Sequence, residues 1–283
     1  MKESCIPLPP IDYPDGVTTI DAAYVRSGFA ASHLLVENGH AAFIDTGTSL
    51  SVPLLLKVLA EKGVSREKVT HVMPTHVHLD HAGGAGALML EFPNAVLVAH
   101  PRGARHMIDP TKLIAGTVAV YGEEITQKLY GTIAPVPEER VLIAEDESRI
   151  DFHGRSLLFL DAPGHARHHY CVIDERSKTL FSGDNFGISY REFDNENGAF
   201  IFPTTTPVQF DPEAMRKTLD RLLSHNPQAV YLTHFGRVTN VEKLGIDLGN
   251  CLDQLVEMAL ELKQKGKAQQ DSLASGVQQI LRD

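Results

Sequence analysis

Hydrophobic and polar residues alternate in short runs along most of the chain, and this pattern predicts strands separated by helices. Apolar or β-branched runs bounded by glycine, asparagine or proline are typical of strands. We expect strands at residues 17–20, 32–37, 40–45, 69–73, 95–99, 149–152, 156–160, 170–173, 179–181 and 228–232. The Asn38-Gly39 pair predicts a tight turn between the second and third of these strands.

Helical spacing of apolar residues appears between the strands and after them. Predicted helices cover residues 52–62, 82–91, 111–120, 123–129 and 212–224. The segment 101–137 holds two of these helices between prolines and glycines, and we interpret it as a helical insertion. From Gly245 onward the pattern is helical and then polar, with residues 263–270 expected in solvent. Two strand-rich halves that both carry helices predict an α/β sandwich of two sheets covered by helices.

Composition narrows the class of protein. The chain has 283 residues, of which 43% are hydrophobic and 22% charged, and this supplies ample material for a core. The formal charge of −10 gives nucleic acid no electrostatic attraction. The amino terminus lacks an apolar signal core, no apolar stretch reaches the roughly 20 residues that a bilayer requires, and the three cysteines show no paired spacing. We therefore expect a cytoplasmic protein that binds neither nucleic acid nor membranes.

Fourteen histidines are the unusual feature of the composition. The stretch THVHLDH, residues 75–81, places three imidazoles and a carboxylate directly after the predicted strand 69–73. His165, Asp184 and His234 likewise follow apolar strands. Because ligand sites favour the carboxyl ends of strands in layered α/β folds, these groups are expected to meet and bind divalent metal ions. The alternative, that each histidine is satisfied separately in the core or at the surface, suits one residue better than the whole set.

This arrangement resembles the metallo-β-lactamase superfamily, whose hallmark is H-x-H-x-D-H followed by a separate His, Asp and His. The resemblance covers about residues 15–245 of one domain, 1–283, with the insertion at 101–137 and a helical tail at 245–283. It implies an αββα sandwich with two metal ions along one edge of the sheets. The ligands that it implies are His76, His78 and His165 for the first ion, Asp80, His81 and His234 for the second, and Asp184 as the bridge between them.

The implied ligand set indicates hydrolytic chemistry. Imidazoles and carboxylates suit zinc first, with manganese or iron as alternatives. Two such ions share a water, lower its pKa and turn it into a nucleophile. Asp80 has a spare carboxylate oxygen, so we expect it to orient that nucleophile or to move a proton. The sequence therefore predicts a hydrolase that uses two divalent metal ions and no organic cofactor.

Further residues are expected around the ligands. Asp45 matches a recurrent aspartate of the superfamily and is expected to orient a ligand from behind, with a turn-forming role as the alternative. His169 resembles a position that is often histidine in the glyoxalase II branch, and we place it in the same layer. The loop 186–210 is rich in aromatic residues. Its expected pocket residues are Phe186, Tyr190, Arg191 and Phe202, and the alternative is that they pack the loop onto the sandwich.

The resemblance does not choose the substrate, because one fold hosts many reactions. A small, partly apolar ester, lactone or thioester fits an aromatic pocket better than a polyanion, which favours a glyoxalase II-like or lactonase-like branch. Gly187 stands where many acyl-homoserine lactonases have tyrosine, and this weakens a lactonase assignment. An iron-dependent oxidoreductase (persulfide dioxygenase-like or oxygen-binding), a phosphodiesterase and a metal-bearing sensor stay open. Helical spacing of Leu252 and Leu255 in the tail allows a homodimer.

Overall fold

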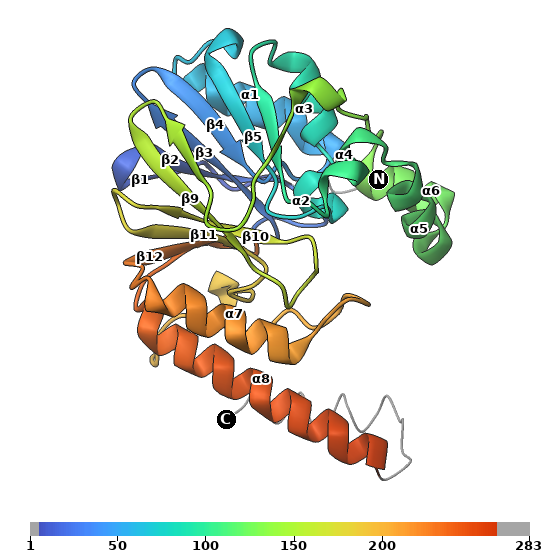
Figure 1. The fold of residues 1–283 in the computed structure, drawn as a ribbon, viewed down its shortest axis with the longest axis vertical. Helices are drawn as coiled ribbons and strands as arrows, with labels where there is room; N and C mark the ends of the chain where they lie inside the picture. The colour runs from blue at the N-terminus through green and yellow to red at the C-terminus, as the bar shows by residue number, and fades with distance from the viewer. Residues whose placement is uncertain (1–5, 265–283) are drawn as a thin grey trace.

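The computed structural model describes residues 6–264, which form two packed β-sheets with helices on the outer face of each (Figure 1). The first sheet has seven strands in the order β1-β2-β3-β4-β5-β6-β7, and the second has six in the order β13-β12-β11-β10-β9-β8. Helices α1 and α3 cover the first sheet, and α7 and α8 cover the second. The predicted αββα sandwich is confirmed.

The bounds of the elements are as follows. The first sheet contains β1 (Ile11–Tyr13), β2 (Val17–Asp21), β3 (Ala31–Glu37), β4 (His40–Ile44), β5 (Val69–Met73), β6 (Val96–Ala99) and β7 (Val141–Ile143). The second contains β8 (Arg149–Phe152), β9 (Arg155–Asp161), β10 (Tyr170–Asp174), β11 (Thr179–Gly183), β12 (Ala229–Leu232) and β13 (Gly236–Val238). The helices are α1 (Val52–Glu61), α2 (Leu79–Ala82), α3 (Ala85–Glu91), α4 (Ala104–Ile108), α5 (Thr111–Tyr121), α6 (Glu123–Tyr130), α7 (Pro212–Ser224) and α8 (Val241–Gln264).

Three apolar layers hold the sandwich together. Leu55 of α1 and Leu88 of α3 pack on the outer face of the first sheet. Phe159 and Phe181 lie in the layer between the two sheets. Leu219 of α7 belongs to the third layer, on the outer face of the second sheet. Each such side chain stabilises the fold by about 1.5–3 kcal/mol relative to leaving it in water. The alternation of faces along each strand lets one sheet serve two layers at once.

Several boundaries differ from the sequence-based expectations. Strands β1, β7 and β13 were not predicted, and each has only three residues. The predicted helix 82–91 is interrupted by Gly83 and Gly84, and helix α2 lies within the histidine motif itself. Helix α8 begins at Val241, its Leu248 packs into the core beside α7, and its Leu252 is buried. The predicted polar segment 263–270 extends past the described residues, as does the end of the predicted tail.

The topology gathers several strand ends at one edge. Strands β4 and β5 are parallel neighbours, and so are β11 and β12 in the other sheet. Strand β9 runs in the same direction as β11, because both are antiparallel to β10. The loops after these five strands therefore open on the same side of the sandwich. Within the described residues, none of the helices has both the length and the apolar character needed to cross a membrane.

Candidate metal centre

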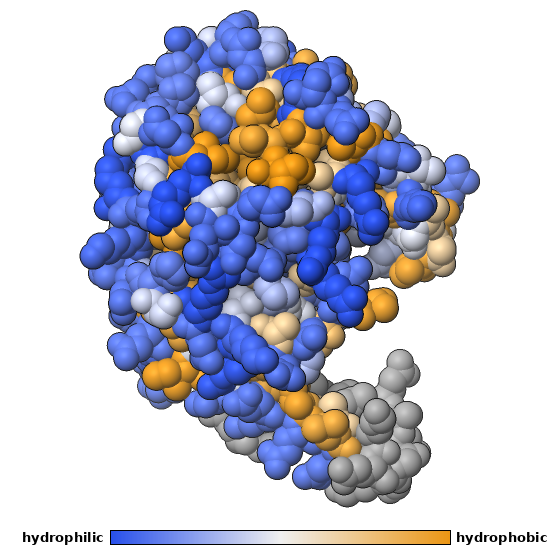
Figure 2. Space-filling model, in the orientation of Figure 1, coloured by the Kyte–Doolittle hydropathy of each residue, from blue (hydrophilic) through white to orange (hydrophobic). Residues whose placement is uncertain are grey.

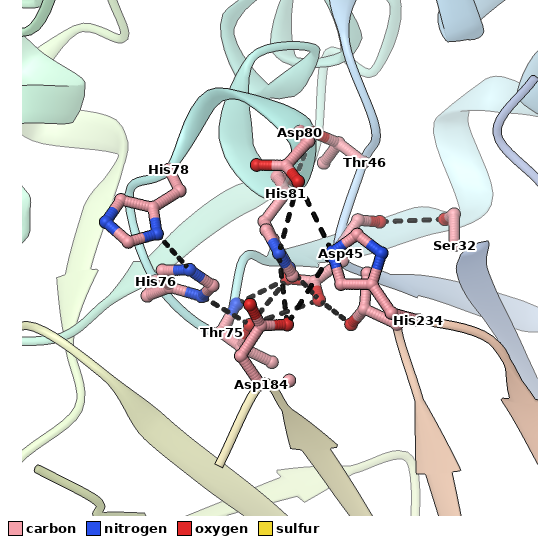
Figure 3. A network of polar contacts seen from close by, with 12 residues as sticks. Ser32, Asp45, Thr46, Thr75, His76, His78, Asp80, His81, Asp184 and His234 are labelled. Atoms are coloured by element: carbon pink, nitrogen blue, oxygen red, sulfur yellow. Dashed lines mark hydrogen bonds and ion pairs between the residues drawn. The ribbon is translucent and has the colours of Figure 1, made fainter. Parts of the chain in front are cut away.

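The THVHLDH stretch leaves β5 as a loop and turns at once into α2. His78 has extended backbone angles (φ −61°, ψ 145°) and precedes the helix. The amides of His81 and Ala82 donate to the His78 carbonyl at 3.0 and 2.8 Å, which closes the helical turn. His76 and His78 thus come from the loop, whereas Asp80 and His81 come from the turn. Figure 3 shows their side chains converging from one short segment.

Glycines precede two of the remaining groups for steric reasons. Gly183, before Asp184, has φ +51°, and a Cβ there would lie 2.5 Å from both His169 Nε2 and Thr75 Oγ1. Gly164, before His165, has φ +140°, and its Cβ would lie 2.5 Å from the backbone of Met215 in α7. Side chains are excluded at both positions, since the chain passes too close to its neighbours. The Gly-His and Gly-Asp pairs are therefore required by how tightly the site is built.

Three imidazoles form the first triad, which consists of His76, His78 and His165. His78 Nδ1 lies 2.8 Å from His76 Nε2 and 3.1 Å from His165 Nε2. A proton shared between two of these three nitrogens forms one hydrogen bond. The lone pair of the third nitrogen is then left without a hydrogen-bond donor. A cation between them satisfies all three. The chemistry of this donor set fits a metal ion.

A second triad consists of Asp80, His81 and His234. His234 Nε2 lies 3.3 Å from Asp80 Oδ2, and His81 Nε2 lies 3.8 Å from the same oxygen. Asp184 faces both triads: its Oδ1 is 3.3 Å from His81 Nε2, and its Oδ2 is 3.2 Å from His165 Nε2. The two carboxylate oxygens of Asp184 are thus aimed at different triads, the arrangement that a bridging ligand requires.

Two buried atoms between the triads lack a partner. His81 Nε2 and Asp184 Oδ1 have no hydrogen bond to any described residue, although they lie close together. Buried polar atoms in native proteins nearly always have a partner. The groups whose ligand atoms lie within 4.8 Å of one another are His76–His78–His165, His76–His81–Asp184 and Asp80–His81–His234. The orphaned atoms and the overlapping groups together fit two adjacent cations.

Outer hydrogen bonds orient the imidazoles. The Thr204 hydroxyl donates to the Asp184 carbonyl (2.8 Å), so it must accept from His165 Nδ1 (2.9 Å). His234 Nδ1 donates to the Phe29 carbonyl at 2.7 Å. His81 Nδ1 donates to Asp45 at 3.0 Å. In each case the Nδ1 proton is held from behind and Nε2 is left to face the centre, as in metal-binding histidines generally.

Asp45 ties the ends of three strands together. It follows β4 with φ +54°, and its carboxylate accepts from the Thr75 amide (2.7 Å) and hydroxyl (2.9 Å) after β5. It also accepts from the Thr233 hydroxyl after β12, at 2.5 Å. With its bond to His81, this fully buried carboxylate fixes parts of both halves of the site. These contacts place it behind the candidate ligands.

His169 occupies a similar position behind Asp184. Its ring is fully buried and lies 4.7 Å from that of His76. The Asp184 amide donates to His169 Nε2 at 3.2 Å. His169 therefore fixes the backbone from which the Asp184 carboxylate extends.

Protonation differs between the triads. Burial lowers the pKa of His78 to about 3 and also lowers the pKa of His76 and His165. Burial acts in the same direction on His81 and His234, but the Asp184 and Asp80 carboxylates outweigh it and raise the pKa of both imidazoles. Without a metal ion, the imidazoles of the second triad therefore keep their protons to higher pH than those of the first, and metal binding would displace these protons.

An aromatic surface flanks the second triad. The Phe29 ring meets the His234 ring edge-on, with centroids 5.4 Å apart, and stacks on Tyr190 at 5.4 Å. Tyr24 stacks on Tyr130 at 5.7 Å, and its hydroxyl donates to that of Tyr130 at 2.9 Å. We call Tyr24, Phe29, Tyr130 and Tyr190 the aromatic flank. Of these four, only Tyr190 belonged to the expected pocket.

The other expected pocket residues lie elsewhere. Phe186 is fully buried in the apolar layer under α7 and offers no surface to a ligand, so its assignment to the pocket was wrong. Phe202 pairs with Ile188 in an isolated β-bridge, and its ring lies parallel to that of Phe200 at 6.4 Å. Arg191 pairs with Asp194 on the same loop at 3.4 Å. These contacts lie within the loop, and a pocket role for Phe202 and Arg191 stays a prediction.

A basic cavity flanks the first triad instead. Its lining residues are Pro101, Arg102, Arg105, His106, Arg167, His168 and Gln209. The sequence contained a signal for some of them. Arg102 follows β6 at the same edge as the candidate ligands, and Arg167 lies two residues after His165. Only the packing of the two sheets shows that these arginines meet.

The fold and site agree with known proteins. The family model of the metallo-beta-lactamase superfamily matches residues 25–234. This chain therefore belongs to the metallo-beta-lactamase superfamily, as the histidine motif suggested. It is 24% identical over 242 residues to the metallo-beta-lactamase fold-containing protein ST1585 of Sulfurisphaera tokodaii, covering 75% of this chain and 86% of that protein. The crystal structure of ST1585 matches with a TM-score of 0.66, covering 86% of this chain and 87% of that one.

Two relatives carry the names of thioesterases. The human acyl-coenzyme A thioesterase MBLAC2 is 29% identical over 192 residues, which are 60% of this chain and 63% of the human protein. The atrochrysone carboxyl ACP thioesterase of Emericella nidulans is 26% identical over 203 residues, which are 70% of this chain and 48% of that protein. The chain thus spans less than two thirds of the length of either thioesterase.

Proposed function

We propose that this protein is a hydrolase with two zinc ions that cleaves a thioester or a related ester. The observation that carries the proposal is the position of Asp184, whose two carboxylate oxygens face two separate triads of ligand groups. His76, His78 and His165 would hold one ion, and Asp80, His81 and His234 the other. When bound, such a pair of ions lowers the pKa of a shared water and polarises the scissile carbonyl.

The protein's own groups would position the reactants. Asp80 keeps 22% of its side chain exposed, more than the 7% of Asp184 or His234, so it borders the open side of the centre. Burial acts to raise the pKa of Asp80, but His81 and His234 outweigh it and keep the carboxylate ionised. Asp80 is therefore suited to orient the attacking water and accept its proton. In the net reaction, the water oxygen joins the acyl carbon, the C–S bond breaks, and the thiol leaves with a proton.

The relatives favour a thioester over the other candidate bonds. Several of the similar proteins are named as thioesterases, some for acyl-coenzyme A and others for an ACP-bound acyl group. The aromatic flank offers an apolar surface beside the second triad, which suits an acyl chain. Phosphodiester hydrolysis and iron-dependent oxidation lack a comparable observation in this chain.

The proposal is tested by metal content and thioester hydrolysis together. The protein would be purified without chelators or a metal-affinity tag and analysed by plasma mass spectrometry. We expect about two zinc ions per chain and release of free thiol from butyryl thioesters. Predominantly iron, with oxygen consumption in place of thiol release, would contradict it. So would metal-loaded protein that cleaves no thioester or ester.

A further inference from the structure

The cavity beside the first triad has a volume of about 750 Å³ and is separate from the aromatic flank. Its wall includes residues after β6, the loop between β9 and β10, and Gln209 ahead of α7. Figure 2 shows strongly hydrophilic residues on the visible face between the region of α4 and that of α7, where the outline is hollowed. His168 joins the cavity to the metal centre, since its ring lies 5.5 Å from that of His78.

Three arginines of the cavity lack a counter-charge. Arg102, Arg105 and Arg167 form no ion pair with any carboxylate in the described part of the chain. Several arginines elsewhere are paired with carboxylates, for example Arg149 with Glu175 and Arg176 with Glu37. A chain with a net charge of −10 has carboxylates to spare. The three unpaired guanidinium groups therefore make the cavity a positively charged region on an acidic protein.

Most hydrogen-bond donors of these arginines are also unused. Arg102 donates one bond, to the Arg167 carbonyl at 3.3 Å, and Arg105 donates one, to His106 at 3.3 Å. A guanidinium carries five N–H donors in a planar fork. His168 adds an independent sign of a ligand: its side chain is only 8% exposed, lines the cavity, and has no described partner for Nδ1. The cavity therefore presents solvent-facing guanidinium donors, and an imidazole nitrogen, that residues 6–264 leave without a partner.

We propose that this cavity binds a phosphate group on the thiol-bearing arm of the substrate. Guanidinium groups bind phosphate through paired, charge-assisted hydrogen bonds. Three guanidinium groups offer paired N–H donors to several phosphate oxygens at once, more than the two oxygens of a single carboxylate can accept. The inference rests on the proposed thioester hydrolysis and names its substrate class, a thioester of a phosphorylated carrier thiol. The acyl chain would then lie toward the aromatic flank, and the leaving thiol toward the basic cavity.

Binding of unreactive analogues tests the cavity without requiring turnover. The probes are S-butyl thioethers of phosphopantetheine and of pantetheine, which differ only in the phosphate, and binding is measured by calorimetry on zinc-loaded protein. We expect the phosphorylated probe to bind at least about 10-fold more tightly, because each charge-assisted hydrogen bond is worth that much. Equal affinity for the two probes would overturn the proposal.

Variants locate the effect. The ratio of the affinities for the phosphorylated and the pantetheine probe should fall by about 3- to 10-fold in each of three variants, Arg102→Ala, Arg105→Ala and Arg167→Ala. The affinity for the pantetheine probe itself should stay unchanged. The matched control is Arg149→Ala, which removes an exposed arginine outside the cavity and is expected to change neither affinity. A preference for phosphate that survives in the triple variant would overturn the proposal. Circular dichroism of each variant separates loss of binding from loss of fold.

Further probes identify the source and kind of anion. Equal binding of the coenzyme A and phosphopantetheine thioethers would support a single phosphate, as on the arm of a carrier protein. Tighter binding of the coenzyme A thioether would support recognition of the nucleotide phosphates as well. A glutathione thioether, which carries carboxylates only, is expected to bind weakly, and binding equal to phosphopantetheine would overturn the assignment to phosphate.

Hydrolysis of butyryl-pantetheine and of its phosphorylated form is measured separately from binding. If neither these nor any other phosphorylated thioester is hydrolysed, the proposed function is contradicted. The binding measurements still decide whether the cavity recognises phosphate.

Discussion

The two flanks of the metal centre present opposite chemistry. Beside His234, the aromatic flank stacks Phe29 on Tyr190, and the Arg26 guanidinium that lies over both rings is paired with Glu192. Beside His78, the basic cavity offers unpaired guanidinium groups and the buried His168. A substrate that spans the centre meets an apolar surface at one end and a cationic one at the other. The contrast fixes which end of the substrate lies on which side of the centre, and it indicates an amphipathic substrate with an acyl chain and an anionic arm.

The triads beneath the flanks differ in the same sense. The first triad consists of neutral imidazoles only, whereas the second includes the Asp80 carboxylate. Asp184 stands between them and belongs to both. Substitutions can therefore be chosen that disturb both sides, one side or only a flank.

Asp184→Ala should have the largest effect, because it removes the carboxylate whose two oxygens face the two triads. We expect loss of both metal ions and a fall in kcat/KM of at least about 1,000-fold, beyond the roughly 10- to 100-fold typical of residues behind metal ligands. The measurements are plasma mass spectrometry and thiol release. Asp194→Ala, on the neighbouring loop, is the control and should keep both metals. Full metal retention in Asp184→Ala would rule out the bridging role.

His78→Ala and His234→Ala should divide the centre. Each removes a ligand group of one triad, so each should lower the metal content from about two ions per chain to about one, with activity reduced by at least about 100-fold. Absorption spectra of cobalt-substituted protein should show that the two variants keep different sites. Identical spectra of the remaining ion in both variants would mean that the triads are not separate sites.

Proton release on metal binding should come from the second triad. Burial lowers the pKa of His81 and His234, but the Asp184 and Asp80 carboxylates outweigh it and raise both, so these imidazoles keep their protons to higher pH than those of the first triad. Burial keeps the first triad neutral, with the pKa of His78 lowered to about 3. Metal affinity of the second triad should therefore rise with pH near 7, by up to about tenfold per pH unit for each proton displaced, while affinity of the first changes little.

Calorimetry in buffers of different ionisation enthalpy counts these protons. In His234→Ala the number released should fall, because one of the two imidazoles with a raised pKa is gone. An unchanged number in His234→Ala, with a reduced number in His78→Ala, would reverse the assignment of the protonated triad.

The smallest effect is expected from the aromatic flank. If the acyl chain contacts Phe29, each added methylene should favour hydrolysis by about 4-fold, the equivalent of about 0.8 kcal/mol. Phe29→Ala should reduce that gain by about 2-fold per methylene, as seen in kcat/KM for acetyl, butyryl and hexanoyl thioesters. Phe193→Ala, on a ring that is 55% exposed outside the flank, is the control. A chain-length preference unchanged in Phe29→Ala would remove the flank from the acyl site.

The sequence predicted local features of the fold and site well. The motif at 75–81 packs four candidate ligands into one segment, and its position after a strand was readable from apolar periodicity. The Gly-His and Gly-Asp pairs also had readable positions, because each follows a buried strand. The short strands β1, β7 and β13 were missed, since three residues carry too little periodicity and their pairing depends on neighbouring strands.

Features that depend on packing could not be predicted from the sequence. Phe186 and Tyr190 lie four residues apart in one aromatic loop, yet Phe186 enters the layer under α7, whereas Tyr190 packs in a separate cluster, stacked on Phe29 and edge-on to His234. Arg102 and Arg167 come from different sheets, and their convergence depends on how the sheets stack. Tyr24 and Phe29 lie in a loop with no motif of its own. Local patterns indicate which residues are buried or turn-forming, but not which distant loops meet.

The most direct test of the metal centre is anomalous X-ray diffraction at the zinc absorption edge, on crystals of protein purified with zinc. The account predicts two peaks about 3.5–4 Å apart, one within reach of His76, His78 and His165, the other within reach of Asp80, His81 and His234, with Asp184 between them. A single peak, or peaks outside these triads, would contradict the two-metal centre on which the proposed hydrolysis depends.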